Sequence, residues 1–142
     1  MELEISDFTG CKIALLCGDS VLTILRDDKP SIPWPNMWEL PGGGREGDES
    51  PFECAAREVY EELGIHLNED CLLRSKVYPS MLFEGRQSVF MVGQLSQEQF
   101  DSITFGDEGQ AYKLMPVEEF LNSKQAVPQL QGRLRDYLKE SE

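Results

Sequence analysis

Residues 43–65 of the chain read GGREGDESPFECAAREVYEELGI, a glycine-rich loop that leads into a segment with helix start and stop signals. Ser50 suits the N-cap, Pro51 suits the first helical position, and Glu53 completes a capping box with Ser50. Gly64 is placed to end the helix, because glycine readily adopts the left-handed conformation found there. The sequence therefore predicts a loop followed by a helix that begins after Ser50 and ends at Gly64.

Three glutamates share one side of this predicted helix. At about 100° per residue, Glu58, Glu61 and Glu62 fall within an arc of about 100°. An apolar stripe lies beside that arc and consists of Phe52, Ala55, Ala56, Val59 and Leu63. A solvated acidic face is the alternative, but such a face would lie opposite the stripe, and no lysine in the helix offsets the repulsion. The pattern therefore favours a functional site.

The three carboxylates offer only oxygen ligands, which select Mg²⁺, Mn²⁺ or Ca²⁺ over zinc. Mg²⁺ keeps several waters and shares its coordination shell with substrate phosphates, so an open cluster of carboxylates suits phosphoryl chemistry. One carboxylate can act as a base while others hold metal ions that polarise phosphoryl oxygens and lower the pKa of bound water.

The length and composition indicate one globular domain over residues 1–142, with 40% hydrophobic and 27% charged residues. No apolar run approaches the roughly 20 residues that cross a bilayer. Residues 1–7 also lack the basic and apolar regions of a signal peptide. We therefore expect a cytoplasmic protein without a membrane partner. The sequence gives no indication of its oligomeric state.

Charge and cysteine usage limit the partners further. A net charge of -13 argues against polymeric nucleic acid, whose phosphates are held by clustered Lys and Arg. A small polyanion remains compatible, because a bound divalent cation inverts the local field. The cysteines are scattered, so we expect small buried thiols rather than a disulfide or a zinc site; they are Cys11, Cys17, Cys54 and Cys71.

The remaining sequence reads as strands first and helices last. We expect strands at 11–17, 20–26, 71–79, 86–96 and 110–115, with a hairpin turn at Gly18 and Asp19. Helices are expected at 117–121 and 129–139, the second with an apolar face formed by Leu130, Leu134, Tyr137 and Leu138. This order predicts an α+β or α/β sandwich.

Residues 43–65 resemble the Nudix box. Gly43, Glu49 and the run REVYEELGI from Arg57 to Ile65 match all nine specified positions of that pattern, and WELPGG before it is typical as well. The resemblance implies an α/β class and the Nudix fold, an α/β/α sandwich around a mixed sheet in which the box forms loop, helix and loop. It also implies hydrolysis of a nucleoside diphosphate linked to another moiety, with Mg²⁺ or Mn²⁺ as cofactor.

The same resemblance implies a role for each matched residue. Glu58, Glu61 and Glu62 would be metal ligands, assisted by the backbone carbonyl of Gly42 or Gly43. Arg57 and Glu49 would orient the cluster. Both belong to the catalytic set that we predict.

Three candidates lie outside the box. Residues 107–110 (DEGQ), followed by YKLMP, resemble a segment of MutT-type nucleoside triphosphate pyrophosphohydrolases that supplies one more acidic group. Glu108 is therefore a candidate metal ligand or general base, with a plain acidic turn as the alternative. Glu58 is the other candidate base. Arg26 resembles an arginine that contacts phosphates in MutT-type proteins, although the loop after it is longer here. Trp34 is a candidate for stacking on a base, with packing as the alternative.

The leading hypothesis is a Mg²⁺-dependent, MutT-like (deoxy)nucleoside triphosphate pyrophosphohydrolase that binds a small nucleotide or diphosphate. Nucleotide sugars, dinucleoside polyphosphates and other small diphosphates are the rival substrates. A non-catalytic Nudix-fold binding or regulatory module is the alternative from another class. Such modules usually have damaged boxes, whereas every acidic position of this box is intact.

Overall fold

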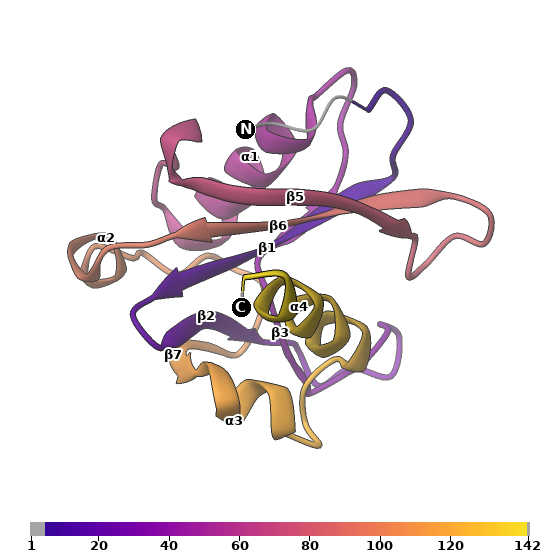
Figure 1. Cartoon of the computed structure of the whole chain (residues 1–142). Helices are drawn as coiled ribbons and strands as arrows, with labels where there is room; N and C mark the ends of the chain where they lie inside the picture. The colour runs from indigo at the N-terminus through magenta and orange to yellow at the C-terminus, as the bar shows by residue number, and fades with distance from the viewer. Residues whose placement is uncertain (1–4, 142) are drawn as a thin grey trace.

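The computed structural model describes residues 5–141 and builds them around a seven-stranded sheet (Figure 1). Neighbouring strands follow the order β3-β2-β1-β6-β5, while β4 pairs with β1 and β7 pairs with β2. The strands are β1 (Gly10–Cys17), β2 (Ser20–Leu25), β3 (Trp38–Glu39), β4 (Gly42–Gly44), β5 (Leu72–Pro79), β6 (Gln87–Gln94) and β7 (Ala111–Pro116). The residues 1–4, from which part of the argument against a signal peptide is drawn, lie outside the described range.

β1 is the strand that brings the glycine-rich loop into the sheet. Along one edge it runs parallel to β6, with Cys11 opposite Val89. Along the other edge its second half pairs antiparallel with β2, and its first half pairs antiparallel with β4, where Lys12 lies opposite Gly42. The sheet is therefore mixed, and the start of β1 fixes the position of the glycines.

Helices cover both faces of the sheet (Figure 1). Side chains alternate along β1, so Cys11, Ile13 and Leu15 point to one face and Ala14 and Leu16 to the other. On the first face α1 (Pro51–Leu63) buries its apolar stripe. On the second face lie α3 (Val117–Asn122) and α4 (Pro128–Glu140). This arrangement confirms the expected α/β class and the three-layer sandwich.

The helix α1 begins and ends where its capping residues place it. The N–H of Glu53 donates to Ser50 Oγ at 3.2 Å, and the N–H of Ser50 donates to Glu53 Oε1 at 2.8 Å. Gly64 has a φ of 70° and donates its N–H to the carbonyl of Tyr60 at 2.9 Å. The capping box and the glycine stop are therefore confirmed.

The other predicted elements are confirmed to within two residues at each end. The structure adds four short elements that the sequence analysis missed: β3, β4, the 3₁₀ turn Glu69–Cys71 and α2 (Gln97–Asp101). β4 consists of three glycines, which carry no strand propensity. α2 had a readable signal, because Ser96 and Gln99 form a capping box.

The cysteines are all free thiols, as expected. Cys11 and Cys54 are buried, whereas Cys17 and Cys71 are only half-buried, so full burial is right for two of the four. Between residues 5 and 141 the structure contains no helix with the length and apolar character needed to cross a bilayer.

Candidate metal and phosphate site

Two glutamates of α1 lie against the glycine-rich loop. The carboxylate of Glu58 is so close to Gly43 that a Cβ there would lie 2.6 Å from Glu58 Cδ. Glu62, one turn later, accepts a hydrogen bond from the N–H of Gly42 at 3.1 Å. Gly42 has a φ of 138°, and a Cβ on it would lie 2.2 Å from the carbonyl oxygen of Cys11. Only glycine fits these two positions, so the loop and the two carboxylates form one surface.

Arg57 braces the acidic side of α1. Its Nε and Nη2 bind the two oxygens of Glu49 at 2.6 and 3.1 Å. Nη1 binds Glu58 Oε2 at 3.0 Å and Glu61 Oε1 at 3.2 Å, and Nη2 also donates to the carbonyl of Gly44 at 2.8 Å. One planar guanidinium therefore ties the loop to the helix, which is the geometry that an orienting role for Arg57 and Glu49 needs.

The charges of the site are unevenly compensated. The hydrogen bonds from Arg57 lower the pKa of Glu49. Burial raises the pKa of Glu58, although Arg57 opposes this effect. Burial also raises the pKa of Glu62, to about 8. For these two carboxylates beside the glycine loop, burial therefore outweighs the attraction of Arg57 and Lys12.

Lys12 and Glu39 are site residues that the sequence analysis missed. Lys12 Nζ donates to Glu39 Oε1 at 2.7 Å and to the carbonyl of Gly42 at 3.2 Å. Burial alone would lower the pKa of Lys12, but attraction by Glu39 and Glu62 outweighs it and raises that pKa. A lysine in the otherwise apolar strand GCKIALLC was the available signal.

Arg26 lies on the other side of Glu39. Its Nη1 binds Glu39 Oε1 at 3.0 Å and its Nε donates to the carbonyl of Pro33 at 2.9 Å. Arg26 and Lys12 therefore share the carboxylate of Glu39, and Lys12 also contacts the glycine loop. The contact of Arg26 with phosphates stays a prediction.

Trp34 is half-buried and packs against the hydrophobic core on the face of the sheet that α4 covers. Its φ of 48° is a left-handed conformation, as is the φ of 59° at Asn36. The packing alternative therefore describes the contact that the structure has, and stacking on a base stays a prediction. Gln110 and Gln125 hold the loop at Asn36, through bonds of 2.9 Å to its Oδ1 and 2.8 Å to its carbonyl.

Glu108 lies in a loop that is fastened to the C-terminal end of α1. The N–H of Thr104 donates to the carbonyl of Leu63 at 2.9 Å, and the N–H of Gly106 donates to the carbonyl of Glu62 at 2.8 Å. Glu108 itself is exposed, and its carboxylate has no ion pair with any residue in the range 5–141. Its role as a ligand or base stays a prediction.

The donor set fits a hard cation. Within the described residues, no three Asp, Glu, His or Cys side chains are gathered closely enough to hold a metal ion. Glu61, with a side chain 54% exposed, pairs with Arg57. Mg²⁺, however, is usually bound by one or two carboxylates together with waters and substrate phosphates. Glu58 and Glu62 supply oxygens of that kind. The carbonyl of Gly43 accepts from Cys54 Sγ at 3.8 Å, and its role as a ligand stays a prediction.

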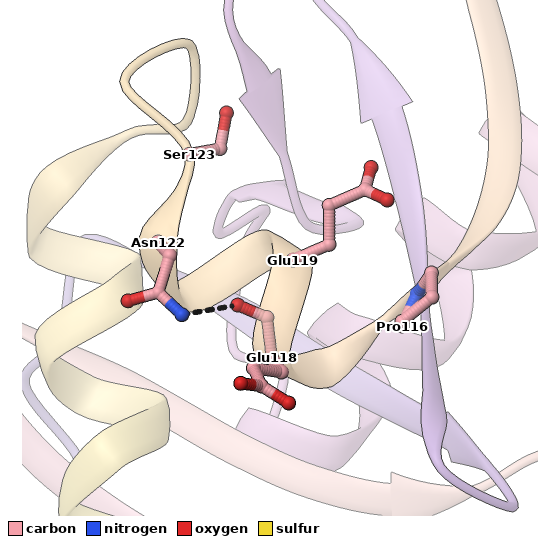
Figure 2. A pocket seen from close by; sticks show the side chains of 5 residues that line it. All are labelled: Pro116, Glu118, Glu119, Asn122 and Ser123. Atoms are coloured by element: carbon pink, nitrogen blue, oxygen red, sulfur yellow. Dashed lines mark hydrogen bonds between the residues drawn. The ribbon is translucent and has the colours of Figure 1, made fainter.

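An open hollow of about 510 Å³ lies elsewhere on the molecule, against α3. Figure 2 shows its lining residues, which are Pro116, Glu118, Glu119, Asn122 and Ser123. Asn122 Nδ2 donates to the carbonyl of Glu118 at 2.9 Å (Figure 2). The lining has no cation for a phosphate, and α3 covers the face of the sheet opposite α1. The hollow is therefore separate from the carboxylate site.

Comparison with known proteins identifies the family. The family model of the NUDIX domain matches residues 12–137, so the chain belongs to the NUDIX family and the resemblance of its box is confirmed. Diphosphoinositol polyphosphate phosphohydrolase 2 of Rattus norvegicus is 34% identical over 107 residues, which cover 68% of this chain and 54% of that protein. The chain thus spans about half the length of the curated relatives that it matches. Proteins of this family generally use divalent metal ions.

Two solved structures share the fold. The MutT protein of Methanosarcina mazei Go1 has a TM-score of 0.75 at 19% identity, with 99% of both chains covered. A bifunctional NMN adenylyltransferase/ADP ribose pyrophosphatase of Francisella tularensis, complexed with AMP and an Mn ion, has a TM-score of 0.69 at 22% identity. That match covers 97% of this chain and 43% of the other. At these identities the likeness supports the fold alone.

Proposed function

We propose that the chain is a divalent-metal-dependent hydrolase of nucleoside diphosphates linked to another moiety. Within that class, the leading hypothesis is a MutT-like (deoxy)nucleoside triphosphate pyrophosphohydrolase. One observation carries the proposal: Glu58 and Glu62, on successive turns of α1, both meet the glycine loop, at Gly43 and Gly42. We also infer that residues 1–142 act as one NUDIX domain. The predicted cytoplasmic location stays a prediction.

The metal site would be formed by Glu58, Glu62 and the carbonyl of Gly43, with Glu61 and Glu108 as further candidate ligands. Bound Mg²⁺ or Mn²⁺ supplies Lewis-acid polarisation of phosphoryl oxygens and a bound water of lowered pKa. The donor chemistry supports this assignment, because carboxylate and carbonyl oxygens suit hard cations.

The chain's own residues would then move the proton and hold the geometry. Water attacks a phosphorus of the diphosphate bridge and the bond to the bridging oxygen breaks. Glu58 or Glu108 accepts the water's proton on a carboxylate oxygen. Arg57 binds Oε2 of Glu58, so Oε1 is the oxygen left for a metal ion or that proton. Glu49 in turn fixes Arg57 through both of its oxygens.

The rival substrates remain small diphosphates. The phosphohydrolase relative supports including diphosphoinositol polyphosphates among them, beside the nucleotide sugars and dinucleoside polyphosphates already named. The intact acidic positions of the box weigh against a non-catalytic binding module.

The metal-site hypothesis is tested by Glu62→Gln, which keeps the size of the side chain and removes its charge. We expect Mg²⁺-dependent turnover to fall by more than about tenfold, because second-sphere or ligand changes at metal sites have effects of about 10- to 100-fold. Glu118→Gln, on the opposite face of the sheet, is the matched control. Activity of Glu62→Gln within tenfold of wild type contradicts the hypothesis.

The substrate class is tested by a panel of nucleoside triphosphates, nucleotide sugars and dinucleoside polyphosphates, assayed with Mg²⁺ and with Mn²⁺. Release of pyrophosphate rather than orthophosphate from a triphosphate supports the MutT-like assignment and identifies the attacked phosphorus. Tight binding without metal-dependent turnover across the whole panel supports the binding module instead.

A further inference from the structure

Two cations meet at a single oxygen beneath the glycine loop. Lys12 Nζ and Arg26 Nη1 lie 2.7 and 3.0 Å from the same atom, Glu39 Oε1. The three side chains are only 19%, 19% and 11% exposed, in the order Lys12, Arg26, Glu39. Removing charges from water costs several kcal/mol per ion, and apolar residues of similar size often stabilise a fold at least as well. A contribution to stability alone therefore does not explain why the chain contains this charged cluster.

The cluster is joined to the metal site by a short chain of hydrogen bonds. Lys12 Nζ donates to the carbonyl of Gly42 at 3.2 Å, and the N–H of Gly42 donates to Glu62 Oε1 at 3.1 Å. The backbones of Lys12 and Gly42 are also paired across β1 and β4. The ammonium group of Lys12 therefore acts on the residue whose N–H orients Glu62, and Glu39 holds that ammonium group in place.

The other end of the cluster reaches the loop between β2 and β3, where Arg26 Nε donates to the carbonyl of Pro33. Glu39 lies in β3 and pairs with Ile24 of β2. Arg26 directly follows the last residue of β2. The backbone N–H of Arg26 donates to the carbonyl of Met37 at 2.9 Å. Glu39 is thus a fixed anchor with a cation on each side, and the cluster carries one positive charge more than negative charge beside Glu62.

We propose that Lys12 is a positioning residue of the metal site: it holds the Gly42 turn, and through that turn the carboxylate of Glu62, in the orientation that binds a divalent cation. Glu39 is the residue that fixes Lys12. This inference rests on the proposed function for its role in turnover, whereas its effect on metal binding is independent of any substrate.

The test compares Lys12→Met with Lys12→Arg. Methionine fills similar space without a hydrogen-bond donor, and arginine restores a donor and a charge. Mn²⁺ binding to the protein is measured by electron paramagnetic resonance without substrate, together with thermal unfolding and, where turnover is found, KM and kcat. We expect Lys12→Met to weaken Mn²⁺ binding by about tenfold, the effect typical of residues that orient metal ligands. Lys12→Arg should recover much of that loss.

Lys124→Met is the matched control, because it makes the same change in net charge at an exposed position. It should bind Mn²⁺ as wild type does. If Lys12→Met fails to fold, Glu39→Gln gives the second measurement, since it removes the partner of Lys12 and should weaken Mn²⁺ binding in the same direction.

Wild-type Mn²⁺ affinity in Lys12→Met, or in a folded Glu39→Gln, overturns the proposal. So does a loss that Lys12→Arg does not reduce, because that loss reflects packing rather than the donor. Wild-type protein that binds Mn²⁺ but hydrolyses nothing in the panel refutes the proposed function alone, and the binding comparison still decides the role of Lys12.

Discussion

Among single residues, Glu62 has the charge balance that we expect of a ligand to the proposed cation. Its side chain is half-buried, its carboxylate accepts a hydrogen bond from the uncharged N–H of Gly42, and burial raises its pKa to about 8. Burial therefore favours the protonated form of Glu62 in the metal-free protein. A divalent cation has to displace that proton, so metal binding is coupled to proton release.

This coupling predicts a pH-dependent stability that Glu62→Gln removes. The folded-state pKa of about 8 lies above the ordinary value of 4.5, so the folded state binds the proton more tightly than the unfolded state. The resulting stabilisation is fully present below about pH 4.5 and is lost as the pH rises towards 8. Between those values, the free energy of unfolding of wild type should fall by a few kcal/mol more than that of Glu62→Gln.

Urea unfolding in the presence of a chelator measures both curves, and the difference between the two proteins cancels the background from the other 25 acidic residues. Repeating the series with saturating Mn²⁺ should shrink the difference at high pH, because the cation favours the ionised carboxylate. Parallel pH curves for the two proteins without metal would show that Glu62 titrates near its ordinary pKa.

At the scale of elements, the short strand β4 places three glycines in a row, only some of which the site requires. A Cβ on Gly43 would collide with the carboxylate of Glu58, whereas a Cβ on Gly44 would meet nothing within 4 Å. Gly43→Ala should therefore lower metal-dependent activity by more than about tenfold, since a shift of about 1 Å at a catalytic group has large effects. Gly44→Ala should stay within about twofold.

Steady-state kinetics of the two variants, with circular dichroism to check folding, show whether a loss of activity comes from the contact with Glu58 or from the backbone of β4. An equal loss in both would mean that β4 needs glycine for its pairing with β1 rather than for the close approach of Glu58.

The helix α1 carries the site, so its two caps should contribute measurably to stability. Ser50→Ala removes the acceptor for the N–H of Glu53 and should cost about 1 kcal/mol. Gly64→Ala forces a Cβ into a φ of 70° and within 3.2 Å of Thr104, and should cost about 1–2 kcal/mol. Urea unfolding measures both against Ser31→Ala, an exposed loop control. Unchanged unfolding midpoints in the two variants would refute a capping contribution.

Sequence alone predicted α1 well because the signals that form it are local. The cap residues, the apolar stripe and the pairing of Arg57 with Glu49 all lie within 15 residues of one another. Lys12 and Glu39 were missed because they meet only through the pairing of β1 with β4 and of β2 with β3. The phosphate contact expected of Arg26 stays a prediction. Its pairing with Glu39 was missed because Glu39 comes from a two-residue strand that has no periodic signal.

At the scale of the whole molecule, the net charge of -13 sets the approach of any anionic substrate. Two anions repel at long range, and salt screens that repulsion over about 8–10 Å at physiological ionic strength. Raising NaCl from about 10 to 150 mM at saturating Mg²⁺ should therefore increase kcat/KM for a nucleoside triphosphate by about twofold or more.

Initial rates at substrate concentrations far below KM measure this effect, with sucrose at equal osmolality as the control. A steady decrease of kcat/KM with salt would show that the local positive field of Arg26 and Lys12 outweighs the charge of the molecule as a whole.

The central position of β1 has a consequence for how the protein is made. Its partners β2 and β4, and the helix α1 above them, are all encoded before residue 64, but its parallel partner β6 spans residues 87–94. During synthesis the ribosome therefore releases the whole acidic helix while one edge of β1 still lacks its neighbour. Open strand edges invite pairing with other chains. Until residues 87–94 have left the ribosome, the open edge of β1 can pair with another chain, and a chaperone bound at that stage would protect the strand that positions the glycine loop.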